Sequence, residues 1–255
     1  MTEIDAYSAD SLFGGRLRLR QPRRGYRFSV DAVLLAHFAR PKPGAHALDL
    51  GCGCGVVALI VAYREPDCRV TALEIQPDLA RLAGENAAEN GMAGRVRALA
   101  GDLRSMRALA GVLPPGSCDL VLCNPPYYQQ GRGRISPEAG IAEARHDFSA
   151  SLADCIRAAA WALKNRGRAA FIFPAEGQAA LQAELMAAGL APKRLRPVYS
   201  YPEAERACLA LVEAVKLGGE GCELLPPFYL YERPGGEESA ALKALYLEEP
   251  CWPSP

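Results

Sequence analysis

From about residue 46 onward, short apolar runs alternate with stretches of helical periodicity. The first run, residues 47–50, passes through a glycine-rich turn directly into an apolar segment at 56–62. Such alternation is typical of βα units that build a parallel sheet. The sequence therefore predicts an α/β fold.

The same pattern places the remaining elements. Further strands are expected at 69–75, 95–100, 119–123, 168–173, 193–201 and 207–216, and helices at 77–90, 151–165 and 178–188. Only residues 202–206 join the last two strands, which is too short for a crossover helix, so this final pair should be antiparallel. We expect seven strands, mostly parallel, with helices on both faces.

Domain organisation follows from where the alternation begins and ends. We expect a basic N-terminal arm over residues 1–25 and a single domain over 26–255. Residues 128–147 have little periodicity and should form a long loop, of a length that is usually functional or mobile. The glycine- and proline-rich tail could add a small hairpin as a short C-terminal extension.

Charge and composition limit the class of protein. The 255 residues hold 29 Lys and Arg against 29 Asp and Glu, so no bulk positive field draws the chain to nucleic acid or membrane. The longest apolar run, 56–63, is far shorter than the roughly 20 residues of a membrane span. The N-terminus lacks a basic, apolar leader, and nine scattered cysteines are not a disulfide framework. We expect a cytoplasmic protein with reduced thiols and no membrane partner.

Glycines 51, 53 and 55 separate the first strand from the first helix of the βα pattern. Glycine lets backbone N–H groups approach a ligand closely at a helix N-terminus. The spacing Gly53-x-Gly55-x-x-Ala58, with Glu74 about 20 residues on, also fits a dinucleotide fingerprint. On spacing alone, a dinucleotide site and a plain glycine turn both remain open.

A wider segment separates these alternatives. Residues 48–55, Leu-Asp-Leu-Gly-Cys-Gly-Cys-Gly, resemble motif I of class I S-adenosylmethionine methyltransferases, a Rossmann-like fold with an acid two residues before the first glycine. The resemblance implies S-adenosylmethionine as cofactor and S-adenosylhomocysteine as product. It implies that Glu74 binds the ribose hydroxyls and Asp102 the adenine amino group. The implied cofactor contacts are Asp49, Gly51, Gly53, Gly55, Glu74, Ile75, Asp102 and Leu103. No metal is expected, because Cys52 and Cys54 lack a second ligand pair.

The tetrapeptide Asn124-Pro125-Pro126-Tyr127 follows the fourth strand. In this fold it resembles motif IV of enzymes that methylate planar amino or amide nitrogens. The Asn124 side-chain oxygen and the Pro125 carbonyl can accept the two N–H bonds of an NH₂ group, and Tyr127 offers a face for stacking. Asn124, Pro125, Pro126 and Tyr127 are therefore the expected catalytic residues, with Asn124 also touching the cofactor. A nucleobase would have to be unstacked to reach them.

Residues 26–35 resemble motif X of the same enzymes, a segment that covers the methionine end of the cofactor. Its expected cofactor contacts are Tyr26, Phe28, Ser29 and Asp31. The segment also fits an amphipathic helix capped by Ser29 or Asp31, and both interpretations can hold together.

Over about residues 12–232 the combination of motifs resembles the bacterial tRNA1(Val) N6-adenine methyltransferase family. The carrying residues are motif X, motif I, Asn-Pro-Pro-Tyr-Tyr, Ala144-Arg145-His146 and the run 211–214. The family often has Phe where Tyr128 stands. The resemblance implies methylation of N6 of an adenine in tRNA, position 37 of valine tRNA. We expect a monomer or weak dimer.

Other functions stay open beside this one. Release-factor glutamine methyltransferases share Asn-Pro-Pro-Tyr but carry a large helical N-terminal domain, whereas only about 25 residues precede motif X here. Another RNA or DNA amino-methyltransferase, or a non-catalytic binding protein on this fold, is the remaining alternative.

Six arginines without an acid fill residues 16–27. A charge run is often only a solvated face, but beside a base-methylating site it favours phosphate contact. The expected RNA-binding residues are Arg16, Arg18, Arg20, Arg23, Arg24, Arg132 and Arg134. Lys193, Arg194 and Arg196 could extend that surface.

Overall fold

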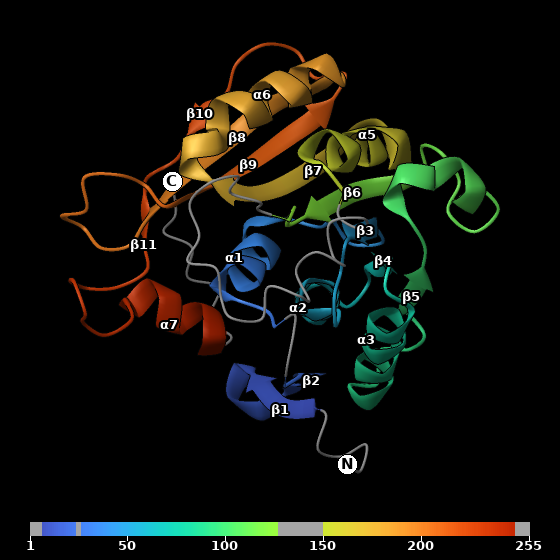
Figure 1. Cartoon of the computed structure of the whole chain (residues 1–255), viewed down its shortest axis with the longest axis horizontal. Helices are drawn as coiled ribbons and strands as arrows, with labels where there is room; N and C mark the ends of the chain where they lie inside the picture. Colours follow the sequence, from blue (N-terminus) through green and yellow to red (C-terminus); the bar gives the residue numbers. More distant parts are fainter. Residues whose placement is uncertain (1–6, 24–26, 127–149, 248–255) are drawn as a thin grey trace, which may run out of the picture.

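A nine-stranded sheet forms the centre of the molecule in the computed structural model, which describes residues 7–23, 27–126 and 150–247 (Figure 1). Its strands are β3 (His46–Leu50), β4 (Arg69–Glu74), β5 (Val96–Ala100), β6 (Cys118–Cys123), β7 (Leu163–Pro174), β8 (Leu190–Tyr199), β9 (Leu209–Lys216), β10 (Glu223–Leu224) and β11 (Phe228–Tyr229). They lie in the order β10-β8-β9-β7-β6-β3-β4-β5, and β11 also pairs with β8.

Most neighbouring strands are parallel, as the sequence predicts. Strand β9 is antiparallel to both β7 and β8, which confirms the expected antiparallel pair at the end of the alternation. The expected number of seven strands is too small. The two-residue strands β10 and β11 add to the edge at β8, and they are too short to show a periodic pattern in the sequence.

Helices cover both faces of the sheet, as expected. They are α1 (Val30–Phe38), α2 (Val56–Arg64), α3 (Pro77–Glu89), α5 (Leu152–Ala162), α6 (Gln178–Ala187) and α7 (Ala240–Leu247), with the 3₁₀ turns η2 (Phe13–Gly15), η3 (Leu103–Leu109) and η4 (Ala175–Gly177). Helices α1, α2 and α7 and the buried side of α3 pack into one apolar cluster, and η3, α5 and α6 into another. Alternating side chains of β3 supply both clusters: Ala47 belongs to the first and Leu48 to the second. Among the described helices, none is long and apolar enough to cross a membrane.

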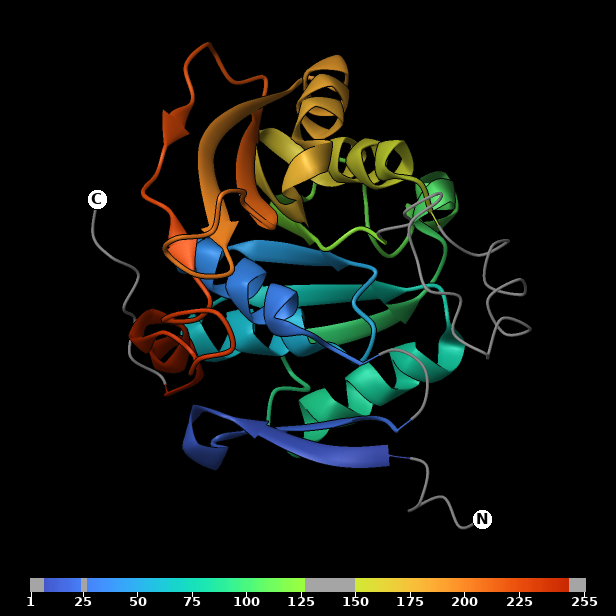
Figure 2. The ribbon, with the colours of Figure 1, turned by 60° about the vertical axis from the view of Figure 1, so that its left-hand side comes forward.

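The N-terminal segment differs from the expected basic arm. Strands β1 (Tyr7–Leu12) and β2 (Leu17–Pro22) form an antiparallel hairpin that lies along α3 (Figure 2). In β2, Leu17 and Leu19 are buried in the first apolar cluster while Arg18 is exposed. This period-two alternation makes the segment part of the domain core. It also explains why α2, which lies beneath the hairpin, is apolar all round.

Two other elements differ from the expected ones. The helix expected over 151–165 ends at Ala162, because Leu163 begins β7 and pairs with Cys118. Gly167 therefore does not close a helix but lies within β7. In the tail, the chain adds α7, whose Leu242 and Leu245 are buried in the first cluster, beyond the small hairpin that was expected. The loop expected at 128–147 lies outside the described residues.

One buried amide joins the hairpin to the domain. Asn86 is 0% exposed; its Oδ1 accepts the Arg20 N–H at 2.9 Å, and its Nδ2 donates to the carbonyls of Arg20 and Cys54, each at 2.9 Å. The Cys54 carbonyl belongs to the glycine-rich turn, so the same side chain supports both segments.

Replacing Asn86 by Ala should lower the free energy of unfolding by about 2–4 kcal/mol, because one buried and two half-buried backbone groups lose their partner. Urea denaturation measures this. Asn90→Ala is the matched control: its amide bonds the Arg18 backbone at an exposed site, and its loss should cost less than about 1 kcal/mol. Equal losses in both variants would contradict the role of Asn86.

Candidate functional site

The site lies where four parallel strands end. Strand β3 pairs with β4 on one side and with β6 on the other, so the chain order reverses at β3. In open α/β sheets, ligands bind outside the carboxyl ends of strands at such a point. Leu50 is in register with Leu73 and Cys123, and Glu74 with Ala100, which brings the residues after β3, β4, β5 and β6 to one edge.

The glycine-rich turn leads from β3 into α2 at this edge. Gly51, Gly53 and Gly55 all have positive φ, at 71°, 56° and 88°. A side chain at Gly55 would also meet the Ala83 Cβ at 3.0 Å, so both backbone conformation and packing require glycine there. Gly51 is exposed and faces open space, so its backbone is accessible to a ligand, whereas residues 52–55 are buried.

Glu74 connects the ends of two strands. The Gly53 N–H donates to its Oε2 at 2.9 Å, and the Gln76 N–H donates to its Oε1 at 3.0 Å. Each carboxylate oxygen keeps acceptor capacity after one such bond. Glu74 is 6% exposed, so this remaining capacity lies in a largely desolvated setting at the end of β4. Such a group suits a pair of hydroxyls. Ile75, which follows it, is half-buried.

Asp49 lies deeper, beneath the turn. Its Oδ2 accepts the Ala58 N–H in the first turn of α2 at 3.1 Å, and the residue is 2% exposed. Burial raises the pKa of Asp49 to about 7, with a further upward contribution from the charge of Glu74. The structure thus places Asp49 as a support of the turn rather than on its outer surface.

Asp102 follows β5 and caps η3. Its Oδ1 accepts the Arg104 N–H at 2.8 Å, and the Arg104 guanidinium bonds both carboxylate oxygens. The hydrogen bond from Arg104 is the largest of the effects that hold the pKa of Asp102 below its usual range. Leu103, which begins η3, is half-buried. Arg104 was not among the sequence candidates, although an Arg two residues after the acid was the available signal.

Asn124, Pro125 and Pro126 stand directly after β6, at the same edge as Gly51. Asn124 is half-buried, Pro125 is buried and Pro126 is exposed. Beneath them, the Cys123 thiol is fully buried and bonds the Cys155 thiol on α5; that bond and burial raise its pKa well above the usual range. The support under Asn124 is therefore neutral. Tyr127 lies outside the described residues.

The segment before α1 comes close to the hairpin. Ser29 caps α1, since its Oγ accepts the Asp31 N–H at 3.4 Å, which confirms the helix and selects Ser29 over Asp31 as the capping residue. The Phe28 N–H donates to the Gln21 side chain at 3.1 Å. Burial raises the pKa of Asp31. Tyr26 lies outside the described residues.

The arginine candidates do not gather at the reaction edge. Arg18 exchanges backbone bonds with the Asn90 side chain, at the far end of the 13-residue helix α3, about 20 Å from its start near Glu74. Arg16 precedes it in the turn of the hairpin, and Arg20 pairs with Glu85 at 2.7 Å and Glu89 at 3.5 Å. Arg23 is exposed after β2, nearer the edge. Arg24, Arg132 and Arg134 lie outside the described residues.

The suggested extension of this surface is wrong at Arg196. Arg196 is 2% exposed, so it is not available to an RNA. The Lys193 ammonium donates to the backbone carbonyls of Gly219, Glu220 and Gly221, which fixes it to the loop after β9.

A hollow of 550 Å³ lies beside Asp102, between η3 and α5. Its lining includes Arg104, which is paired with Asp102, Arg157, which is paired with Asp154, and also Arg107 and the partly buried ring of Trp161. Guanidinium groups beside an aromatic ring suit phosphate contact and base stacking. Sequence reasoning missed these residues because they come from two segments that only the fold brings together.

A family model described as methyltransferase small domain matches residues 29–176, a range that contains the glycine-rich turn, Glu74, Asp102 and Asn124. The chain belongs to this family. Methyltransferase chemistry therefore replaces the dinucleotide alternative that the glycine spacing alone left open.

Individual relatives are more specific than the family model. A protein named tRNA1(Val) (adenine(37)-N6)-methyltransferase from Porphyromonas gingivalis is 30% identical over 194 residues, covering 74% of this chain and 75% of the relative. One of the same name from Shewanella amazonensis is 33% identical over 168 residues, covering 65% of this chain and 68% of the relative. These names confirm the resemblance that the motifs indicate.

Solved structures agree on the fold of the methyltransferase. The crystal structure of a predicted O-methyltransferase from Agrobacterium tumefaciens superposes with a TM-score of 0.69 at 22% identity, covering 86% of this chain and 96% of the other. This confirms the Rossmann-like class I methyltransferase fold.

The raised pKa of Asp49 gives a test of its position in the methyltransferase. Unfolded Asp49 loses its proton near pH 4, whereas the folded carboxyl keeps it to about pH 7. Rising pH therefore removes stability between these values. Relative to wild type, Asp49→Asn should gain up to about 4 kcal/mol in free energy of unfolding from pH 4 to pH 7. Urea titrations at a series of pH values measure it.

Asp102→Asn serves as the comparison. Because the pKa of folded Asp102 is lowered, its contribution to stability is complete above pH 4 and is lost only as pH falls. The difference between this variant and wild type should stay constant from pH 5 to pH 7. A constant difference for Asp49→Asn as well would refute its buried, protonated state.

Proposed function

We propose that this methyltransferase transfers a methyl group from S-adenosylmethionine to N6 of an adenine in tRNA, adenine 37 of valine tRNA. The observation that carries the proposal is the position of Asn124-Pro125-Pro126 directly after β6, beside the glycine-rich turn and Glu74. The names of the relatives from P. gingivalis and S. amazonensis support tRNA as substrate and do not favour the release-factor alternative.

The residues at the edge fit the cofactor by their chemistry. Glu74 keeps two acceptor positions in a desolvated setting, which suits the ribose hydroxyls. Asp102, paired with Arg104, retains acceptor capacity for an adenine amino group, with Ile75 and Leu103 beside the base. The accessible backbone at Gly51, with Gly53, Gly55 and Asp49 beneath it, and Phe28, Ser29 and Asp31 in the preceding segment would enclose the methionine end. The cofactor, when bound, supplies an electrophilic methyl group on a sulfonium.

The chain's own residues orient the nucleophile. Asn124 Oδ1 and the Pro125 carbonyl would accept the two N–H bonds of the adenine amino group and direct its lone pair toward the methyl carbon. A new N–C bond forms as the S–C bond breaks, and the nitrogen, cationic after transfer, loses one proton to solvent. Most of the acceleration then comes from proximity and orientation. Tyr127 would stack on the unstacked base.

The setting of the reaction completes the proposal. Arg23 is exposed, and Arg104, Arg107 and Arg157 line the hollow beside Asp102; phosphate contacts with these groups would hold the anticodon loop. We place the enzyme in the cytoplasm, where tRNA is modified, as a monomer or weak dimer.

Methyl transfer from labelled S-adenosylmethionine to bulk tRNA, compared with transfer to release factor, tests the proposal. We expect label in tRNA, and N6-methyladenosine as the labelled nucleoside after digestion. Label in release factor, or a different methylated nucleoside, would overturn the assignment.

Asn124→Ala should lower kcat by about 10²- to 10³-fold, because one of two acceptors that orient the amino group is lost. Cofactor affinity by calorimetry should change by less than about threefold. Retained turnover in Asn124→Ala would remove Asn124 from the catalytic residues.

Glu74→Gln should weaken cofactor binding by about 10- to 100-fold, the equivalent of losing a hydrogen bond to a charged group. In this variant the side-chain NH₂ group, which is a donor, also faces the N–H group of Gly53 or of Gln76, where the carboxylate offered an acceptor. The matched control is Gln76→Ala, which keeps the backbone N–H that Glu74 accepts. If both variants bind the cofactor equally well in calorimetry, Glu74 does not contact the ribose.

A further inference from the structure

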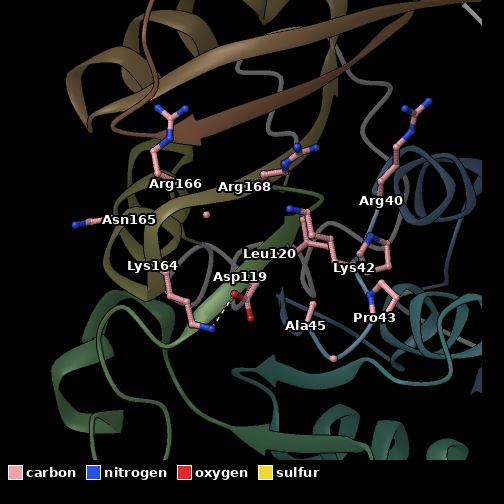
Figure 3. A pocket seen from close by; sticks show the side chains of 13 residues that line it. Arg40, Lys42, Pro43, Ala45, Asp119, Leu120, Lys164, Asn165, Arg166 and Arg168 are labelled. Carbon is pink, nitrogen blue, oxygen red and sulfur yellow. Dashed lines mark hydrogen bonds and ion pairs between the residues drawn. The ribbon is translucent and has the colours of Figure 1, made fainter.

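A basic pocket lies at the amino ends of the strands, on the edge opposite Asn124. Its volume is 330 Å³, and it is lined by residues 40–45 before β3, by Asp119 and Leu120 of β6, and by residues 164–168 of β7 (Figure 3). From Asp119 to Asn124 the chain runs along β6 for five residues, about 17 Å. The pocket is therefore separate from the site of methyl transfer.

Positive charge dominates the lining. Five cations, Arg40, Lys42, Lys164, Arg166 and Arg168, accompany a single carboxylate, Asp119. Asp119 is occupied by Lys164 at 2.7 Å, the pair drawn with a dashed line in Figure 3. Arg168 lies 3.3 Å from Glu213, which is 1% exposed and shared with Arg194 at 3.5 Å.

The remaining three cations have no such compensation. Arg166 donates to the Leu217 carbonyl at 3.0 Å, which positions the guanidinium without neutralising it. Among the described residues, no carboxylate lies within ion-pair distance of Arg40 or Lys42. The positive charge there is in excess.

The backbone is distorted where it presents these cations. Between two paired positions, β6 advances from Cys118 to Leu120 while β7 advances from Leu163 to Arg168, so β7 carries three extra residues. Arg166 lies in this bulge with a φ of 65°, a left-handed conformation that costs about 1 kcal/mol or more for a side chain of this kind. A Cβ at Gly167 would meet the Lys164 carbonyl oxygen at 2.9 Å. Strain of this kind is concentrated at binding sites.

We propose that this pocket binds phosphate groups in the backbone of the tRNA substrate, away from the methylated nucleotide. The cations lie on two separate segments and open to solvent, which suits successive phosphates of a polyanion. None of the thirteen lining residues is aromatic, so the pocket offers no face on which a free nucleotide's base could stack. A folded tRNA with one adenine at Asn124 extends well beyond 17 Å. The inference rests on the proposed function for its choice of RNA.

The test variant combines Lys42→Gln with Arg166→Gln, which removes two charges and keeps the bulge. With full-length tRNA, KM should rise about tenfold and kcat should stay unchanged, because phosphate contacts contribute to affinity. The slope of log KM against log salt should fall by about 2, one for each lost contact. Cofactor affinity by calorimetry should equal that of wild type.

Two matched variants separate the pocket from general charge and folding effects. Lys42→Arg with Arg166→Lys keeps both charges and should restore most of the wild-type KM. Arg233→Gln with Lys243→Gln removes two exposed cations elsewhere on the surface and should leave KM within about twofold of wild type. An equal rise in KM in this pair would overturn the pocket as a specific site.

Three further outcomes also test the inference. Unchanged KM and salt slope in the pocket variant, with active wild type, overturn the inference and leave the proposed function standing. If wild type methylates no tRNA, the proposed function fails and the inference falls with it. Inorganic pyrophosphate serves as a small-anion probe: if only its binding is lost in the variant while KM for tRNA is unchanged, the pocket serves a free phosphate compound and the RNA assignment is overturned.

Discussion

The hydrogen bonds of the Glu74 carboxylate are the interaction on which the reaction edge depends. A turn with three glycines of positive φ gains much entropy on unfolding and cannot hold one shape by itself. Glu74 ties its centre, through the Gly53 N–H, to the end of the neighbouring strand. Asp49 ties the following helix to β3 from below, through Ala58. The two carboxyl groups therefore fix the turn from both sides, and one of them still faces the ligand position.

The hairpin extends this support to a segment far away in the chain. Asn86 bonds the backbone of Arg20 in the hairpin and the carbonyl of Cys54 in the turn. Gln21 in turn holds the Phe28 N–H just before α1. The turn, the hairpin and the segment before α1 thus share polar anchors as well as one apolar cluster. A change in any of these three segments should therefore affect the same edge of the sheet.

Features set by residues that are close together in the sequence could be predicted from it, whereas features set by contacts between distant segments could not. The βα alternation, the glycine-rich turn, the acids after β4 and β5 and the antiparallel final pair are written in local patterns. In the hairpin, the period-two alternation of Leu17 and Leu19 was present, but the arginines that alternate with them favoured a solvated arm. The bulge at 164–167 exists only because β6 pairs on both sides of it, and Leu163 continues the apolar spacing of α5. Arg104, the partner of Asp102, is only two residues away in the sequence. An arginine at that position does not by itself predict an ion pair, because the pairing depends on the turn that η3 makes.

The balance of 29 cations and 29 anions conceals an uneven distribution of charge between the two edges of the sheet. A polyanion would be repelled by open carboxylates at the reaction edge. Asp49 and Glu74 are only 2% and 6% exposed, however, and Asp102 is paired with Arg104, so little negative charge reaches the surface. At the opposite edge the cations are exposed and outnumber the carboxylate beside them. Burial of the acids, more than surplus of the bases, is therefore what makes a chain of zero net charge compatible with an RNA substrate.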